Sequence, residues 1–492
     1  MSGAVAQQPA RSATAARSTC SSSPASPISY AINFMIRIVN RLVPLRTLAL
    51  RISEGLLIFA ALLVACRADV GEHLASTPAY SQVGLVGIVI LFCMYCLDVY
   101  EPQITSHHAH SLWRVMQAMG LTLLIIAVVP YAWLSVRIDL ATVLFGMLLV
   151  GAALTTSRYL FAELARRPAL AEPAVVWGSG PLAASIIREL RRRPDIGIRV
   201  LGIVDHDYAG DTFEGLHYLG PPEVIWTMAA SGEARRIIVA VGERRGCLPV
   251  ERLMAVKAAG LSVEDGTELY ENLTGKVWLG AFSIGLLLFS RRVERSLVRL
   301  FLNRSLSVFF AVIVLIIAAP VMLITALLIR LDSDGPALLR QTRVGENGRY
   351  FTLFKFRSMK LGADRAESLA PATPDDPRCT RIGKWIRRFH LDELPQLFNI
   401  LKGDMYFVGP RPFVPDQEAW LVREIPYYRQ RWAVRPGATG WAQVHRGYCL
   451  SVEDNTDKLS YDLYYIKNLS MGLDLVTLLK TFKILLLGQG GR

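Results

Sequence analysis

The chain has 492 residues, of which 52% are hydrophobic and only 19% are charged. That length exceeds one ordinary domain, and the composition is typical of a membrane protein with sizeable soluble parts rather than a disordered chain. The net charge of +13 fits the basic cytoplasmic flanks of inner-membrane proteins and their attraction to anionic lipid. No basic stripe interleaved with aromatic residues accompanies this charge, so no nucleic-acid partner is expected.

The N-terminal segment, residues 1–34, is rich in Ala and Ser and contains no acidic residue. It lacks the continuous apolar core of a signal peptide, so we expect a disordered tail. Met35 then opens a basic lead-in to the first apolar run, and translation could start at Met1 or at Met35. The sequence alone leaves both starts open.

Four apolar runs follow, and each is near the length of about 20 residues that crosses a bilayer. They cover residues 48–66, 83–97, 115–134 and 140–161. Arginines precede the first run and follow the fourth, whereas the first and third connections carry few basic residues. The sequence therefore predicts four transmembrane helices within 46–162, with both ends of the bundle facing the cytoplasm.

From residue 171 the pattern changes to that of a soluble α/β domain, expected over 171–270. An apolar strand leads through Gly178 and Gly180 into a helix, and the segment 201–207 predicts a second strand that ends near Asp205. This succession is typical of a Rossmann-like domain. The glycine turn serves equally well as a nucleotide site or as a plain strand-to-helix turn, and both alternatives stay open.

A fifth apolar run, at 305–329, has Pro320 near its middle and arginines on both sides. A helix that crossed the membrane would put one basic flank outside, against the positive-inside bias. Because Pro320 removes a backbone hydrogen bond, it allows the helix to bend. We therefore expect a re-entrant membrane helix over 297–330. The alternative, a kinked crossing helix, would place residues 331–492 outside the cell.

The segment 390–412 has the most informative chemistry. Its adjacent carboxylates, Asp392 and Glu393, precede a helix start at Pro395, and acids beside arginines at a helix start suit chemistry on a phosphate. The alternative for the pair is an acidic helix cap. Asp404 is either a site acid or, as we favour, a turn residue. The basic residues nearby are Lys355, Arg357, Arg381, Lys384, Arg387, Arg388 and Arg411.

Three motifs in this order carry a family resemblance: LDSDGPALLRQTRVGENGRYFTLFKFRSM at 331–359, LDELPQLFNILKGDMYFVGPRP at 391–412 and RPGATGWAQV at 435–444. The region resembles the bacterial sugar transferase family, the polyprenyl-phosphate hexose-1-phosphate transferases that start exopolysaccharide repeat units. The upstream domains resemble its long-form members, and the ending resembles the subgroup associated with exosortase (PEP-CTERM) systems. One departure, His445-Arg446 where many members have Asn-Gly-Arg after the third motif, leaves the transferred hexose open.

The resemblance implies an α/β membrane protein with four parts. These are a four-helix transmembrane bundle, a Rossmann-like domain, a re-entrant membrane helix, and a mostly helical, membrane-associated catalytic domain over 331–492. It also implies a location in the bacterial inner membrane with the catalytic domain on the cytoplasmic face, contact with membrane lipid, and a homodimer.

The implied reaction transfers hexose-1-phosphate from a UDP-sugar to undecaprenyl phosphate, giving undecaprenyl-diphosphate-sugar and UMP, as the first membrane step of exopolysaccharide biosynthesis. Asp392 matches the family's nucleophile, which forms a phosphosugar-aspartyl intermediate. Glu393 matches the neighbouring acid, which holds Mg²⁺ or orients the site. The residues expected to bind substrate are Lys355, Arg357, Arg387, Arg411, Pro412 and Arg446.

Two other classes of protein are weighed against this enzyme. A membrane-tethered Rossmann-type oxidoreductase would be shown by NAD(P) binding or reduction, and a non-catalytic scaffold by the loss of one acid of the pair. Asp392 and Glu393 are both present, which favours the transferase.

Overall fold

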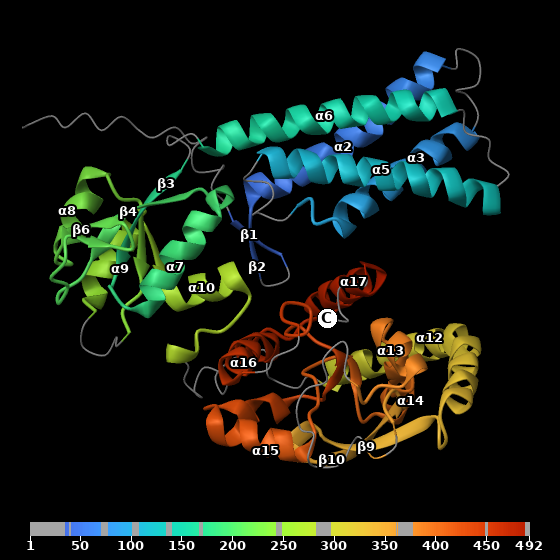
Figure 1. The fold of residues 1–492 in the computed structure, drawn as a ribbon. Coiled ribbons are helices and arrows are strands. Elements are labelled where there is room, and N and C mark those ends of the chain that lie inside the picture. Colours follow the sequence, from blue (N-terminus) through green and yellow to red (C-terminus); the bar gives the residue numbers. More distant parts are fainter. Residues whose placement is uncertain are drawn as a thin grey trace, which may run out of the picture.

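The computed structural model describes residues 35–38, 41–69, 77–100, 108–133, 140–166, 171–242, 248–281, 297–360, 362, 377–447 and 451–487. The expected tail at 1–34 lies outside this part of the chain. Figure 1 shows three groups of elements: the long helices within residues 45–166, a sheet with short helices within 172–281, and a third group within 297–487. The α/β class predicted from the sequence is confirmed.

Four long helices pack together at the four predicted apolar runs. Their core includes Ile58, Ile90 and Leu154, all fully buried. A buried ion pair at 2.8 Å joins Arg158 to Glu54 and links the last helix to the first. These helices, with the strand pair before them, are β1 (Met35–Ile38), β2 (Arg41–Pro44), α2 (Leu45–Asp69), α3 (Thr77–Cys96), α5 (His108–Trp133) and α6 (Leu140–Arg166).

Within the described residues, three helical segments are long and apolar enough to cross a membrane: Thr47–Arg67 in α2, Thr142–Leu164 in α6, and Arg304–Asp332. The apolar stretches of α3 and α5, Val83–Cys96 and Ser111–Ala127, are shorter. Large apolar side chains are exposed along these helices, as expected for surfaces that face lipid rather than water.

The second group is a six-stranded sheet in the order β5-β6-β4-β3-β7-β8, parallel except at the β5–β6 edge. Central strand β3 is buried on both faces, because Ala174 and Val176 pack into one core while Val175 and Trp177 pack into the other. The elements are β3 (Glu172–Trp177), α7 (Pro181–Arg192), η2 (Pro194–Ile196), β4 (Ile198–Val204), β5 (Thr212–Phe213), β6 (Leu216–Gly220), α8 (Val224–Ser231), β7 (Arg236–Val239), α9 (Val250–Ala258), β8 (Ser262–Asp265), α10 (Gly266–Thr274) and η3 (Leu279–Ala281).

This strand order, with the chain reversing direction across the sheet at β3, is that of a Rossmann-type fold. Gly178 follows β3 with φ +124°, and a Cβ there would lie 2.8 Å from the carbonyl oxygen of Ala240. A residue without a side chain is therefore required by the close approach of the β3 and β7 ends. The predicted strand–turn–helix and the position of Asp205 just after β4 are confirmed.

Helix α12 (Leu297–Asp332) has 36 residues and contains Pro320. The 29 residues from Arg304 to Asp332 would extend about 43 Å if they were straight, yet both Arg304 and Asp332 contact the same domain. Arg304 donates to the carbonyl oxygens of Ile400 and Leu401, while Asp332 Oδ2 accepts from the amide of Ile382 at 3.0 Å. Figure 1 shows the helix changing direction along its length. The bend brings both ends of α12 to the domain that follows it.

That last domain combines helices with two small sheets. Strands β9 (Leu338–Val344) and β10 (Tyr350–Phe356) form an antiparallel pair, and β11 (Tyr406–Val408) and β12 (Gly437–Thr439) form a parallel one. The remaining elements are η4 (Glu346–Gly348), α13 (Arg381–Arg388), η6 (Leu391–Glu393), α14 (Gln396–Lys402), α15 (Pro415–Glu424), η7 (Tyr428–Ala433), α16 (Val452–Lys467) and α17 (Met471–Leu487).

The domains are joined by specific contacts. After α10, the carbonyl oxygen of Gly275 accepts from the buried Trp441 Nε1 at 2.8 Å, and the Val277 amide donates to Ser460 in α16. Helix α17 lies between the long-helix bundle and the last domain in Figure 1, and its Lys483 forms an ion pair with Asp98 beyond the end of α3.

Candidate active site

The two adjacent carboxylates lie on η6, the single 3-10 turn between α13 and α14. His390 precedes this turn with φ 56°, a left-handed conformation that reverses the chain after α13. The turn contacts α13 and strand β10. Behind it, α14 begins at the N-cap Pro395 and ends at Gly403, whose φ of 96° suits glycine. The predicted helix start at the proline is confirmed.

Glu393 is paired with Arg411, which follows β11. Arg411 Nη2 lies 2.6 Å from Glu393 Oε1, and Nη1 lies 3.4 Å from Oε2. Burial alone would raise the pKa of the Glu393 carboxyl, but the charge and hydrogen bonds of Arg411 hold that pKa below its ordinary value. Glu393 is therefore ionised at neutral pH.

Asp392 has the opposite shift. Burial, together with the adjacent negative charge of Glu393, raises the pKa of the Asp392 carboxyl to about 7, although Lys355, Arg387 and Arg411 oppose the rise. Neighbouring carboxyls whose pKa values are pushed apart are typical of catalytic pairs. The three cations come from β10, α13 and the loop after β11, so the fold brings three separate segments to this pair.

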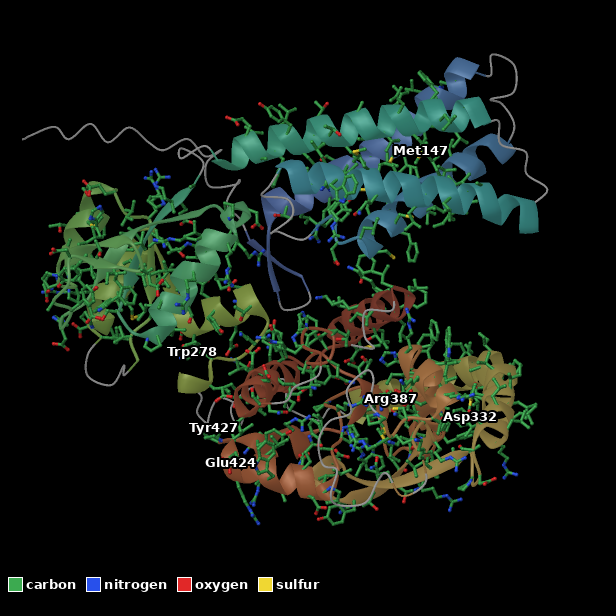
Figure 2. The ribbon with its side chains drawn as sticks, in the orientation of Figure 1. Met147, Trp278, Asp332, Arg387, Glu424 and Tyr427 are labelled. Atoms are coloured by element: carbon green, nitrogen blue, oxygen red, sulfur yellow. The ribbon has the colours of Figure 1, made fainter. Side chains whose placement is uncertain are left out.

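Figure 2 labels Arg387 inside the last domain and Asp332 at the end of α12. Arg387 Nη1 lies 3.2 Å from the Sγ atom of the buried Cys379. Lys355 lies on β10 and Arg387 on α13, and both of these elements pack on α12, through Phe356 and Ile386 against Ile329. Arg411 comes from the loop after β11.

Arg357, predicted to lie near the phosphates, is directed elsewhere. Its side chain is buried and donates to the carbonyl oxygens of Ser333 and Asp334 and to the hydroxyl of Ser333. These are groups at the C-terminal end of α12, where a cation is favourable. The structure therefore places Arg357 as a cap of α12 rather than with the carboxyl pair.

Pro412 and Arg446 differ in position. Pro412 adjoins Arg411 and borders a shallow recess, partly open to solvent, which is also lined by Gly345, Arg411 and Trp432. Arg446 is half-exposed and binds Asp457 at 2.5 Å, at the junction with the sheet domain. The structure brings Pro412 to the carboxyl pair through its neighbour Arg411, and it does not do so for Arg446.

Asp404 behaves as the turn residue that we favoured. Its Oδ2 accepts from Asn399 Nδ2 at 3.2 Å and pairs with Lys402 Nζ at 3.2 Å. It closes the end of α14.

Sequence reasoning missed Asn399, a fully buried residue of α14. Its Oδ1 accepts from the Phe354 amide at 2.9 Å, and its Nδ2 donates to the Thr352 carbonyl at 2.6 Å. It ties the helix after the carboxyl pair to the strand that holds Lys355. The available signal was a lone amide within an apolar helical run, since buried polar groups need partners.

Within the described residues, no group of three or more His, Cys, Asp or Glu side chains could form a metal site. Mg²⁺ does not need such a cage, because it is commonly held by one or two carboxylates together with substrate phosphates and water. The Asp392–Glu393 pair fits this arrangement.

Comparisons with known proteins identify the family. A family model described as bacterial sugar transferase matches residues 298–488, and one described as a CoA-binding domain matches residues 95–245. An exopolysaccharide production protein from Rhizobium leguminosarum biovar phaseoli is 42% identical over 181 residues, which are 36% of this chain and 90% of that protein. The chain belongs to the bacterial sugar transferase family.

Two further relatives have names that state a reaction. A UDP-N-acetylgalactosamine-undecaprenyl-phosphate N-acetylgalactosaminephosphotransferase from Aeromonas hydrophila is 41% identical over 49% of this chain and 56% of its own length. A UDP-glucose:undecaprenyl-phosphate glucose-1-phosphate transferase from Klebsiella pneumoniae is 28% identical over 88% of this chain and 94% of its own length. The match to the Aeromonas protein thus spans little more than half of that relative, whereas the Klebsiella match shows the long form.

Proposed function

We propose that this protein transfers a hexose-1-phosphate from a UDP-sugar to undecaprenyl phosphate, producing undecaprenyl-diphosphate-sugar and UMP as the first membrane step of exopolysaccharide synthesis. The observation that carries the proposal is the carboxyl pair of opposite pKa shifts, surrounded by Lys355, Arg387 and Arg411. The names of the relatives supply the donor and acceptor classes.

The reaction has two displacements at one phosphorus atom. In the first, an Asp392 carboxylate oxygen attacks the sugar-bearing phosphorus of the UDP-sugar, an O–P bond forms, and the bond to the bridging oxygen breaks so that UMP leaves. In the second, a phosphate oxygen of undecaprenyl phosphate attacks the same phosphorus and releases the Asp392 carboxylate. A pKa near 7 makes this carboxylate more basic than an ordinary aspartate while much of it stays ionised at neutral pH.

We assign the cations to two different substrates. Arg411 follows β11 and borders a shallow recess, and we assign the nucleotide to it. Lys355 and Arg387 belong to β10 and α13, which pack on α12, and we assign the acceptor phosphate to them, because an acceptor on a lipid tail must approach along the apolar α12. Both sets offset the negative charge of a carboxylate that attacks a diphosphate.

Glu393, with Asp392, would hold Mg²⁺. When bound, the ion would neutralise diphosphate charge that the three cations leave unbalanced. Chelation with EDTA should stop UMP release, and Glu393→Gln should lose most activity while a folded protein remains. Full turnover in excess chelator would remove the metal from the proposal.

For the membrane arrangement, we place the protein in the bacterial inner membrane. The helices α2, α3, α5 and α6 cross it, α12 enters and returns, and the last domain lies on the cytoplasmic face. Support comes from the segments of crossing length, the bend in α12, and the contacts of both α12 ends with one domain. A homodimer is proposed from the resemblance to long-form members alone.

The experiment that tests the function is incubation of membranes containing the protein with undecaprenyl phosphate and a panel of UDP-sugars. One UDP-sugar should support UMP release and formation of a lipid-linked diphosphate sugar, which also identifies the hexose. Absence of UMP release with every sugar of the panel, from folded protein, would contradict the proposal.

A further inference from the structure

Behind Arg411 lies a second arginine, Arg431, on the 3-10 helix η7. Its side chain is buried, with 4% of its surface exposed. Its Nη2 donates to the carbonyl oxygen of Arg411 at 2.9 Å. The neighbouring residues of the same loop are held from the other direction, because Gly409 donates to the Thr439 carbonyl and Pro410 accepts from Gly437. The backbone that presents Arg411 to Glu393 is thus fixed on two sides.

Arg431 itself is fixed by a network of buried partners. Its Nε pairs with Asp462 Oδ2 at 2.7 Å, its Nη1 donates to the Tyr428 hydroxyl at 2.9 Å, and Glu418 lies 3.7 Å away. The guanidinium also stands 5.0 Å from the centre of the Phe413 ring. Each of the three guanidinium nitrogens therefore donates to a partner, and this arrangement limits the movement of the Arg411 peptide that Nη2 holds.

A buried charge network of this kind is weak evidence for stability, because apolar residues of similar volume often stabilise as much. What distinguishes the Arg431 network is the backbone group that it holds. Arg431 reaches across 20 residues of sequence to one backbone carbonyl, that of the residue whose guanidinium lies 2.6 Å from Glu393.

We infer that Arg431 is a positioning residue that acts through Arg411 on the nucleotide-releasing half of the reaction. The inference rests on the proposed function and deepens it. Arg431 also borders the recess beside Arg411 that we assign to the nucleotide. A displaced Arg411 would leave Glu393 without its partner and would weaken the hold on the departing UMP phosphate. The lipid acceptor, which we assign to Lys355 and Arg387, would still bind and react as in the wild type.

Ping-pong kinetics separate this role from a plain structural one. When a covalent intermediate divides a reaction, kcat/KM for the first substrate reports only the first half, and kcat/KM for the second substrate only the second. A misfolded fraction lowers both constants equally, because it removes active enzyme. A positioning defect on the nucleotide side lowers only the constant for the UDP-sugar.

The test uses Arg431→Lys, which keeps the charge but loses the fork, with Arg429→Lys as the matched control on the exposed face of the same short helix. For Arg431→Lys, kcat/KM for the UDP-sugar should fall about ten-fold or more, while that for undecaprenyl phosphate stays within about two-fold of wild type. Arg429→Lys should change neither constant. Added to Arg411→Ala, Arg431→Lys should cause no further loss, since coupled residues are non-additive.

Equal losses in both constants, or full additivity with Arg411→Ala, would overturn the inference. If Arg431→Lys fails to fold, Tyr428→Phe replaces it, because this change removes only the hydroxyl that holds Nη1. It should lower the same constant selectively, and an unchanged ratio of the two constants would equally refute the role of Arg431. A wild-type protein that releases no UMP from any UDP-sugar would instead refute the proposed function.

Discussion

At the scale of single residues, the contrast between Asp392 and Glu393 shows how environment divides two adjacent carboxyls. Glu393 has a guanidinium within 2.6 Å and stays ionised, and that negative charge, added to burial, raises the pKa of Asp392 to about 7. The pair therefore contains one permanent anion and one carboxyl that titrates near neutral pH. The division of labour in the proposed mechanism follows from this difference.

Replacement of Asp392 by Asn should abolish UMP release, because an amide cannot form the carboxyl–phosphate bond. Mass spectrometry of wild-type protein with UDP-sugar and no acceptor should locate a phosphosugar adduct on Asp392. Asp404→Asn is the matched control, since Asp404 serves a turn, and it should retain most activity. An adduct found on another residue would contradict the assignment of the nucleophile.

The raised pKa of Asp392 predicts an acid limit to activity. As the pH falls through about 7, the carboxyl takes up a proton and loses the negative charge that makes it a good nucleophile, so kcat/KM for the UDP-sugar should decrease. Lys355→Met removes a positive charge that lowers this pKa, so the acid limb of the pH profile should move to higher pH. A profile that stays unchanged, or moves to lower pH, would show that Lys355 does not face Asp392.

At the scale of elements, α12 exposes most of its apolar side chains, while one face of it packs on the last domain through residues such as Ala311, Leu315, Met322 and Ile329. Two polar contacts add to this packing. Arg304 donates to carbonyl oxygens in the last turn of α14, and Asp332 accepts from the Ile382 amide in the first turn of α13. Each charge complements the helix end that it meets. The same two helices flank the carboxyl pair, so the contacts of α12 connect this largely exposed apolar helix to the site.

The topology of α12 can be tested by thiol labelling in a cysteine-free background. Cysteines placed at Arg295 and at the exposed Arg349 should both be protected from a membrane-impermeant reagent in intact cells, and both should react after permeabilisation. Pro320→Leu restores a backbone donor and should favour a straight crossing, with loss of activity. External labelling near Arg349 in the wild type would refute the re-entrant arrangement.

At the scale of the whole molecule, the Rossmann-like domain contributes atoms to the core of the last domain. Val277 is buried among Leu459, Leu463 and Trp441, and Lys467 pairs with the buried Glu271 at 2.7 Å. Burial raises the pKa of Glu271, and Lys467 opposes this rise. The two domains therefore meet through a desolvated ion pair and an apolar contact.

Loss of the Lys467 charge should loosen that junction. Lys467→Met leaves the Glu271 carboxylate buried without a cation, at a cost of about 1–3 kcal/mol. The midpoint of thermal unfolding should fall, and amide hydrogen exchange should increase around Val277. Glu271→Gln in the Lys467→Met background should recover most of the loss, because it removes the unpaired charge. If Lys467→Met alone is as stable as the wild type, the Lys467–Glu271 pair does not hold the domains together.

The sequence by itself determined the order of parts and the identity of the carboxyl pair. Apolar runs predicted the long helices, alternating strands and Gly178 predicted the sheet domain, and the LDELPQ segment predicted a helix start after two acids. These features are local, because periodicity, turn chemistry and capping act over a few residues. Family membership also follows from motifs that are continuous in the chain.

Only the tertiary structure decided which cations meet the carboxyl pair. Lys355 and Arg357 are two residues apart on one short segment, yet the first faces Asp392 while the second caps α12. Arg431 and Asn399 were not recognised from the sequence, because their partners are backbone carbonyls that lie far away in the chain. Such contacts depend on packing between elements, and no spacing rule along a single segment encodes them.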